Sequence, residues 1–195
     1  MKPTLFALAA TALLAAAPPT AGQPAPAFDV KDLQGKPISL AALKGKVVVL
    51  EWTNPGCPFV VRHYETGILP ALQKQAAAQG AVWITVNSTN AGHKDFLADA
   101  ALGGKLAAWK NGAAHVVADP AGTLGQSYGA KTTPHVFVID GKGVVAYAGA
   151  VDDDPRGNKP ERVGYLAQAL EALKAGKAPA TTSTAPYGCS VKYAQ

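Results

Sequence analysis

The segment Val47–Tyr64 joins a run of apolar residues to a turn and then to a helix-forming stretch, and it constrains the fold more than any other part of the chain. Val47–Leu50 is a continuous apolar run of the kind found in buried central strands. The turn that follows ends at Cys57, and Pro58 suits the first position of a helix because its missing N–H would have no partner there. The sequence therefore predicts a cysteine at a helix N-terminus, just beyond the carboxyl end of a central strand.

This position would favour a reactive thiol at Cys57. The helix dipole and the free backbone N–H groups of the first turn stabilise a thiolate, which is the nucleophilic form of cysteine. A structural half-cystine and an inert buried thiol are the alternative interpretations, since cysteine pairs in exported proteins often serve only as crosslinks.

Length and charge limit the remaining possibilities. A chain of 195 residues with 48% hydrophobic content can bury one good core, so a single domain is expected. The formal net charge of +5 comes from scattered positive residues that form no run or stripe. Because phosphate contacts need a concentrated basic surface, we do not expect nucleic-acid binding.

The chain divides into three parts. Residues 1–22 are typical of a signal peptide, with a positive Lys2 followed by the apolar run Leu5–Ala17, which is too short for stable membrane insertion. Residues 23–176 form the predicted domain, and residues 177–195 form a predicted flexible tail that carries Cys189. The mature protein is therefore expected in the periplasm or outside the cell, where disulfides persist.

Periodicity predicts an α/β domain with a central mixed sheet flanked by helices, an N-terminal hairpin and an extended C-terminal tail. The predicted strands are 28–33, 36–40, 46–52, 82–86, 113–118, 135–139 and 144–150. The predicted helices are 41–44, 58–78, 95–110, 121–128 and 159–175, with a kink or restart near Pro70 in the second of them.

Three motifs resemble the thioredoxin-like redoxin family, the group that includes the alkyl hydroperoxide reductase and thiol-specific antioxidant proteins. The first places Trp52 and a turn before Cys-Pro-Phe-Val at residues 57–60, and the second is Lys-Thr-Thr-Pro-His at residues 131–135, similar to the cis-proline strand of thioredoxins. The third combines Gly-Ala-Val-Asp-Asp at residues 149–153 with Pro-Tyr-Gly-Cys-Ser at residues 186–190 and resembles an exported subgroup. The resemblance implies a thioredoxin-like fold and thiol redox chemistry.

The sequence also departs from the known patterns of this family. Thioredoxins have a second cysteine where this chain has Val60, so a disulfide across one helical turn is excluded. Peroxiredoxins have threonine three residues before the reactive cysteine, and here that place is taken by Asn54, with Thr53 one residue too early. The sequence is therefore a hybrid of the two groups.

The resemblance implies that Cys57 is catalytic and that Trp52, Asn54, Thr133 and Pro134 bind the substrate. Cys189, the only other thiol, is the expected resolving partner. About 14 residues separate it from the last predicted helix, and such a segment can reach roughly 45 Å, far enough to return to Cys57.

Two functions from different classes remain open. One is a thiol-dependent oxidoreductase in which Cys57 attacks a peroxide or a protein disulfide, with a reducing thiol or thiol-disulfide partner protein to restore it. The other is a non-catalytic module, crosslinked by Cys57 and Cys189, that binds a partner along the cis-proline groove. No cofactor is expected, and no metal, because the four histidines show no ligand spacing (His63, His93, His115 and His135).

Overall fold

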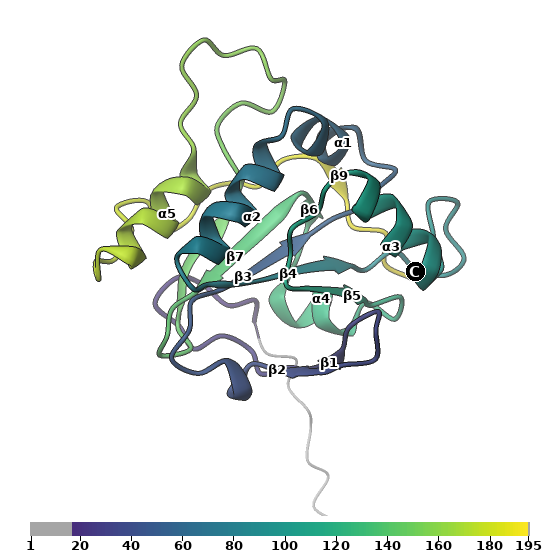
Figure 1. Cartoon of the computed structure of the whole chain (residues 1–195), viewed down its shortest axis with the longest axis horizontal. Helices are drawn as coiled ribbons and strands as arrows, with labels where there is room; N and C mark the ends of the chain where they lie inside the picture. The colour runs from purple at the N-terminus through teal and green to yellow at the C-terminus, as the bar shows by residue number, and fades with distance from the viewer. Residues whose placement is uncertain (1–16, 195) are drawn as a thin grey trace, which may run out of the picture.

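A five-stranded mixed sheet forms the centre of the molecule in the computed structural model, which describes residues 17–194 (Figure 1). Its strands are β3 (Val48–Trp52), β4 (Val82–Asn87), β5 (His115–Ala118), β7 (His135–Ile139) and β8 (Val145–Gly149). They lie in the order β5-β4-β3-β7-β8. The strands β3, β4 and β5 are parallel, whereas β7 is antiparallel to β3 and to β8. This is the mixed sheet that the sequence predicts.

Helices cover one face of the sheet, and smaller elements cover the other. The first layer contains α1 (Pro58–Glu65), α2 (Ile68–Ala78), α3 (Asp99–Ala108) and α5 (Tyr165–Lys174). The second contains α4 (Thr123–Tyr128), the 3-10 turn η1 (Ala41–Leu43) and the hairpin of β1 (Asp29–Lys31) and β2 (Pro37–Ser39). Because successive strand side chains point to opposite faces, Val49 packs in the first layer while Val48 and Leu50 pack in the second.

Three helix boundaries differ from the predicted ones. The first long helix breaks at Gly67, whose φ of 75° is accessible mainly to glycine, and not at Pro70. The last helix begins at Tyr165 and not at residue 159, because the carboxylates of Asp153 and Asp154 bind backbone N–H groups of residues 157–159 and 163 and hold them in a loop. The helix predicted from residue 95 begins at Asp99.

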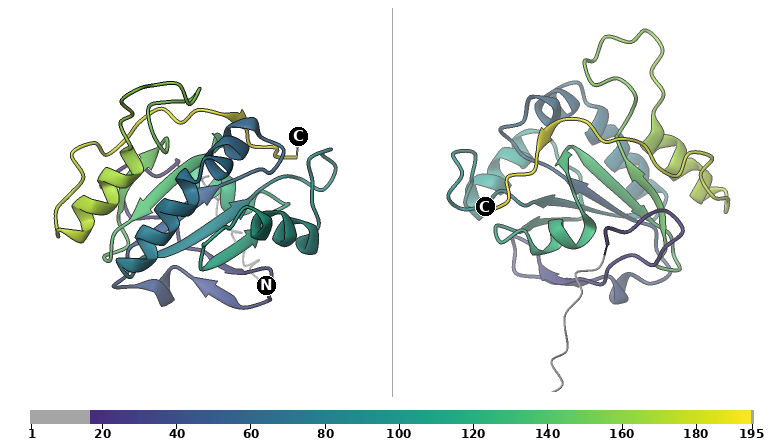
Figure 2. Two further views of the ribbon diagram at one scale, coloured as in Figure 1. Left: turned by 45° about the horizontal axis from the view of Figure 1, so that its top comes forward. Right: turned by 180° about the vertical axis from the view of Figure 1, so that it is seen from behind.

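The C-terminal segment has a defined course across the domain. Its strand β9 (Cys189–Ser190) pairs antiparallel with β6 (Thr132–Thr133), just before β7. Figure 2 shows this segment, in yellow, crossing the end of the sheet beside α1. The segment that the sequence predicts as a flexible tail is therefore held by strand pairing at Cys189.

Two irregular segments lie along the outer edge of β8. The N–H of Gly22 donates to the oxygen of Val145 at 2.8 Å, and the N–H of Val145 donates to Gln23 at 2.9 Å. Further along, Ala148 exchanges hydrogen bonds of 3.1 Å with residues 182 and 184. Residues 1–16 of the predicted signal peptide lie outside the described part of the chain. Within the described part, no helix has the length and apolar character needed to cross a bilayer.

Candidate functional site

Cys57 is the residue that immediately precedes α1, which confirms its predicted place at a helix start. The loop before it is shaped by Asn54, whose side-chain oxygen accepts from the N–H of Gly56 at 2.8 Å and whose backbone oxygen accepts from Cys57 at 2.9 Å. A Cβ at position 56 would lie 2.6 Å from Cγ of Asp95, so a larger residue there would have to push the Asp95 carboxylate aside. The loop thus fixes the thiol at the end of β3.

The thiol of Cys57 is buried against the segment that contains the cis peptide bond Thr133–Pro134. Its sulfur donates to the backbone oxygen of Thr133 at 2.9 Å, and only 1% of the residue is exposed. Cys189 lies opposite Thr133 in the β6–β9 pair, and its thiol is within hydrogen-bonding contact of Cys57. Both cysteines are free thiols, so the structure represents the reduced form.

The two thiols differ in acidity. Burial opposes ionisation of Cys57, but hydrogen bonds from the Thr133 side chain and the Cys189 thiol outweigh it and hold the pKa of Cys57 below its ordinary value. The backbone N–H groups of Val60 and Cys189 act in the same direction. For Cys189, burial and the interaction with Cys57 raise the pKa to about 11. Cys57 is therefore the better thiolate of the pair.

Gly188 allows the tail to approach the cis-proline segment closely. Its φ is 129°, and a Cβ there would lie 2.1 Å from the backbone oxygen of Thr133. Any side chain would both strain the backbone and collide with that oxygen. This glycine is what lets Cys189 reach Cys57.

Tyr187 anchors the tail on the helix side of the two cysteines. Its hydroxyl donates a short hydrogen bond to Oδ1 of Asp152 and lies 2.8 Å from Nε2 of His63. The Nη2 of Arg62 donates to the oxygen of Asp154 at 2.7 Å, so the cluster also ties α1 to the loop after β8. Burial and the nearby charges of Arg62 and Arg162 lower the pKa of His63 to about 3, which keeps this imidazole neutral.

Two further residues anchor the tail, one before and one after Tyr187 in the sequence. Before it, the Oγ1 of Thr184 accepts from the N–H of Ala150 at 2.9 Å and lies 2.6 Å from the hydroxyl of Tyr147. After it, the hydroxyl of Tyr193 donates to the oxygen of Ala130 at 2.9 Å, and its ring packs on two glycines of the α4 region, Gly122 and Gly125. We call residues 184–193 the strap.

The predicted substrate-binding residues have different environments. Trp52 is fully buried in the second layer, where its Nε1 donates to Oγ of Ser88 at 3.0 Å, so it offers no surface to a substrate. Asn54 is 2% exposed and shapes the cysteine loop. Thr133 and Pro134 do lie at Cys57, but both are buried, and β9 pairs with Thr133.

A buried carboxyl group lies on β3 between the sheet and the helix layer. Glu51 is fully buried and accepts hydrogen bonds of 2.9–3.3 Å from Tyr64, Gln73, Trp83 and Thr85. Burial raises the pKa of Glu51 to about 7, although the four donors oppose this shift. The sequence analysis assigned no role to this residue.

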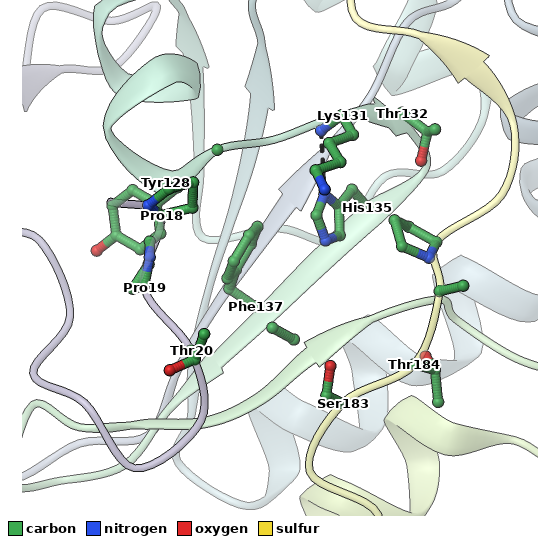
Figure 3. Close-up of a pocket in the computed structure, with 14 residues that line it drawn as sticks. Pro18, Pro19, Thr20, Tyr128, Lys131, Thr132, His135, Phe137, Ser183 and Thr184 are labelled. Atoms are coloured by element: carbon green, nitrogen blue, oxygen red, sulfur yellow. Dashed lines mark hydrogen bonds between the residues drawn. The ribbon is translucent and has the colours of Figure 1, made fainter. Parts of the chain in front are cut away.

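A cavity of about 620 Å³ lies beside residues 184–186 of the strap, and neither cysteine is part of its wall. Figure 3 shows His135 at this wall, with Nδ1 accepting from the N–H of Lys131 at 3.2 Å. Burial lowers the pKa of His135 to about 4. No group of three or more His, Cys, Asp or Glu side chains in residues 17–194 is arranged to hold a metal ion.

Sequence reasoning missed the anchoring residues. Asp152, Asp154 and His63 were not expected to take part in the site, yet only 1%, 4% and 0% of these residues are exposed. The one available signal was the aromatic residue two positions before the second cysteine, Tyr187. Nothing in the local pattern indicated its partners, because they come from two distant segments, α1 and the loop after β8.

Comparison with known proteins gives one family and several similar folds. The sequence matches the Redoxin family over residues 20–166. A search of curated proteins gives no match. A hypothetical protein from Sinorhizobium meliloti is 27% identical with a TM-score of 0.79, over 90% of this chain and 95% of that one.

Two smaller structures of thiol-disulfide or thioredoxin proteins are also similar. A candidate thiol:disulfide interchange protein DsbE from Chlorobium tepidum has a TM-score of 0.52 at 26% identity, over 65% of this chain and 82% of its own. The exposed lipoprotein thioredoxin Etrx1 from Streptococcus pneumoniae has a TM-score of 0.50 at 26% identity, over 63% and 87% of the two chains.

Proposed function

The chain belongs to the Redoxin family, and from this membership and the paired thiols we propose that it is an extracytoplasmic thiol oxidoreductase. In this function Cys57 is the attacking thiolate and Cys189 is the resolving thiol. The observation that carries the proposal is the contact of the two free thiols at the start of α1, where Cys57 is the more acidic of the pair.

With a disulfide substrate the reaction has two exchange steps. The Cys57 thiolate attacks one sulfur of the substrate, a mixed disulfide forms at Cys57, and the other substrate sulfur leaves as a thiolate. The deprotonated sulfur of Cys189 then attacks Cys57, releases the second substrate thiolate and leaves the Cys57–Cys189 disulfide. The substrate gains two electrons and the protein loses two.

With a peroxide the first product is different. The Cys57 thiolate attacks one oxygen of the O–O bond, forms a sulfenic acid and releases an alcohol or water once the leaving oxygen takes a proton. The Cys189 thiol then condenses with the sulfenic acid, which gives the same disulfide and one water. In both cases an external dithiol must return two electrons, so a reducing thiol or thiol-disulfide partner protein belongs to the proposal.

Cys189 performs the role that Val60 cannot. A thioredoxin-type helix carries its second thiol three residues after the first, and here that position is a fully buried valine. The strap brings a thiol to Cys57 from the opposite side, along Thr133. Thr133 contributes a hydrogen bond that favours the Cys57 thiolate, and Asn54 holds the loop.

The strap also weighs against the binding-module alternative. That alternative needs an open groove along the cis-proline segment for a partner peptide. In the described structure the strand edge at Thr132–Thr133 is already occupied by β9. A partner that binds there would have to displace the strap for as long as it stays bound, whereas the resolving step of the thiol chemistry needs the strap to hold Cys189 beside Cys57.

Location outside the cytoplasm is supported by the apolar segment at residues 5–17 and by the similarity to the S. pneumoniae protein, which is an exposed lipoprotein. An oxidising compartment would supply the oxidant, and a dedicated reducing partner would then be needed there. Substrate and partner would meet the molecule at the strap.

The test is to add one equivalent of hydrogen peroxide, or of a small aromatic disulfide, to the reduced protein and map its thiols by mass spectrometry. We expect the wild type to lose two hydrogens and to yield one Cys57–Cys189 crosslink. Cys189→Ser should stop at a sulfenic acid or a mixed disulfide on Cys57, and Cys57→Ser should consume neither oxidant above background. Wild-type protein that keeps two free thiols with both oxidants would refute the proposal.

A further inference from the structure

The strap gives the two sulfurs very different access to solvent, and this asymmetry bears on how the oxidised protein is reduced. Cys57 is 1% exposed, beneath the strap and the oxygen of Thr133. Cys189 is partly exposed, although its side chain also packs against the first core layer. We propose that the reducing thiol attacks the Cys57–Cys189 disulfide at Cys189, so that Cys57 is the leaving group. This rests on the proposed function, in which that disulfide forms.

The direction of attack favours Cys189. In thiol–disulfide exchange the incoming thiolate approaches along the S–S axis, from the side opposite the sulfur that leaves. Cys189 is partly exposed, so its sulfur can be approached from solvent while the strap stays in place. For attack on Cys57 the incoming sulfur would have to pass the strap, because Cys57 belongs to the first core layer and is only 1% exposed.

The leaving group favours the same sulfur. Attack at Cys189 releases the thiolate of Cys57, which the helix start and Thr133 stabilise. Attack at Cys57 would release the thiolate of Cys189, whose pKa is raised to about 11 by burial and by Cys57. A thiol of lower pKa leaves faster, so access and leaving-group acidity act together.

The anchors keep this arrangement in place while the bond exchanges. Tyr187 holds the strap two residues before Cys189, through Asp152 and His63. Tyr193 holds it four residues after, through the oxygen of Ala130. Neither of these anchoring hydrogen bonds involves a cysteine. The strap can therefore stay bound to the domain while the disulfide is reduced at Cys189.

The partner thiolate forms a bond to Sγ of Cys189, the Cys57–Cys189 bond breaks, and the electron pair goes to Sγ of Cys57. A second thiol of the partner then attacks the partner's own sulfur in the mixed disulfide and releases Cys189, which takes up a proton. The partner is therefore a dithiol that is oxidised to a disulfide while the protein gains two electrons.

Glutathione is a suitable probe because its adduct can be mapped. Oxidised wild-type protein is mixed with glutathione, quenched with acid at increasing short times and digested, and the adduct on each cysteine is extrapolated to zero time. We expect at least tenfold more adduct on Cys189 than on Cys57. An excess on Cys57 at the earliest times would overturn the inference and leave the oxidoreductase intact, whereas failure to form the disulfide would refute both.

Tyr187→Phe tests whether the strap directs the attack by limiting access to Cys57. It removes the hydroxyl bonds to Asp152 and His63 but keeps the ring against Phe59, so the strap should loosen while the fold remains. We expect the adduct ratio to fall toward unity. The control is Tyr165→Phe, since Tyr165 lies at the start of α5, outside the strap, and should keep the wild-type ratio. An unchanged ratio in Tyr187→Phe would show that the strap does not direct the attack.

Discussion

Replacing Glu51 with glutamine should change how the stability of this protein depends on pH. Glu51 is fully buried on β3, and burial raises the pKa of its carboxyl group to about 7 in the folded state, from an ordinary value of 4.5. Between these two pH values the folded protein holds a proton that the unfolded chain releases. Stability from this group is therefore full below pH 4.5 and is lost as the pH rises through about 7.

The size of the effect follows from the gap between the two pKa values. Each pKa unit corresponds to about 1.4 kcal/mol, so ionising Glu51 should lower the free energy of unfolding by about 3 kcal/mol in total. Glutamine cannot ionise, and this loss should disappear. Its amide N–H₂ would face the donors of Trp83 and Gln73, which should cost a roughly constant 1–3 kcal/mol at every pH.

Two histidines oppose this trend in the wild type. Burial lowers the pKa of His63 to about 3 and that of His135 to about 4, so their contributions are lost as the pH falls below 6.5. The pH dependence of the wild-type free energy of unfolding therefore combines a loss at high pH from Glu51 with a loss at low pH from the two histidines. The difference between Glu51→Gln and wild type removes the histidine contributions, because both proteins contain them.

Urea unfolding at pH 4.5, 6 and 8 provides the measurement. We expect the free energy of unfolding of Glu51→Gln, relative to wild type, to rise by about 3 kcal/mol from the lowest to the highest pH. The exposed carboxyl of Glu65 on α1 provides the control, and Glu65→Gln should show less than about 0.5 kcal/mol of such change. A relative change below about 1 kcal/mol for Glu51→Gln would refute the reasoning.

Four further predictions concern the cysteine pair, the strap, the core residue Trp52 and the mature N-terminus. The ultraviolet thiolate titration of Cys57 should have a higher midpoint in Cys189→Ala than in Cys189→Ser, since the serine hydroxyl can still donate to the sulfur; equal midpoints would contradict the role of that hydrogen bond. Gly188→Ala should detach the strap, because its Cβ would lie 2.1 Å from the backbone oxygen of Thr133. We expect the free energy of unfolding to fall by about 1–3 kcal/mol in thermal or urea unfolding. Iodoacetamide should alkylate Cys57 at least tenfold faster than in the wild type. Trp52→Phe should lower the free energy of unfolding by about 2–4 kcal/mol, because it leaves a cavity in the core and removes the hydrogen bond to Ser88. It should leave the thiolate titration of Cys57 unchanged, because Trp52 and Cys57 lie in different core layers. The mature N-terminus of the exported protein should fall between residues 18 and 26 by intact-mass measurement, and retention of Met1 would contradict export.

The fold could be predicted from the sequence because its signals are local. The apolar run at Val47–Leu50 and the β-branched run at residues 82–86 identify the central strands, and Pro58 marks the helix that Cys57 begins. The helix boundaries near residues 95 and 159 were missed because side-chain bonds to backbone N–H groups override helical periodicity there.

The site could be predicted only in part, for a physical reason. The pairing of Cys57 with Cys189 follows from counting thiols, but the shape of the strap depends on contacts between distant segments, such as Tyr187 with Asp152 and Gly188 with Thr133. Trp52 was assigned to the substrate by resemblance alone. Successive side chains of a strand point to opposite faces, and Glu51 points to the helix layer. Trp52 therefore points to the other layer, and this alternation could have been read from the sequence.

The segments beside β8 have a consequence for solubility. An uncovered outer strand presents a row of unpaired backbone groups that can recruit a second chain and start aggregation. Here Gly22 and Gln23 cover the beginning of β8, and residues 182–184 cover its end. Removal of a leader that ended before residue 22 would preserve this cover, whereas cleavage beyond Pro24 would expose the edge at Val145. Selection against self-association would therefore favour export processing at the earlier sites.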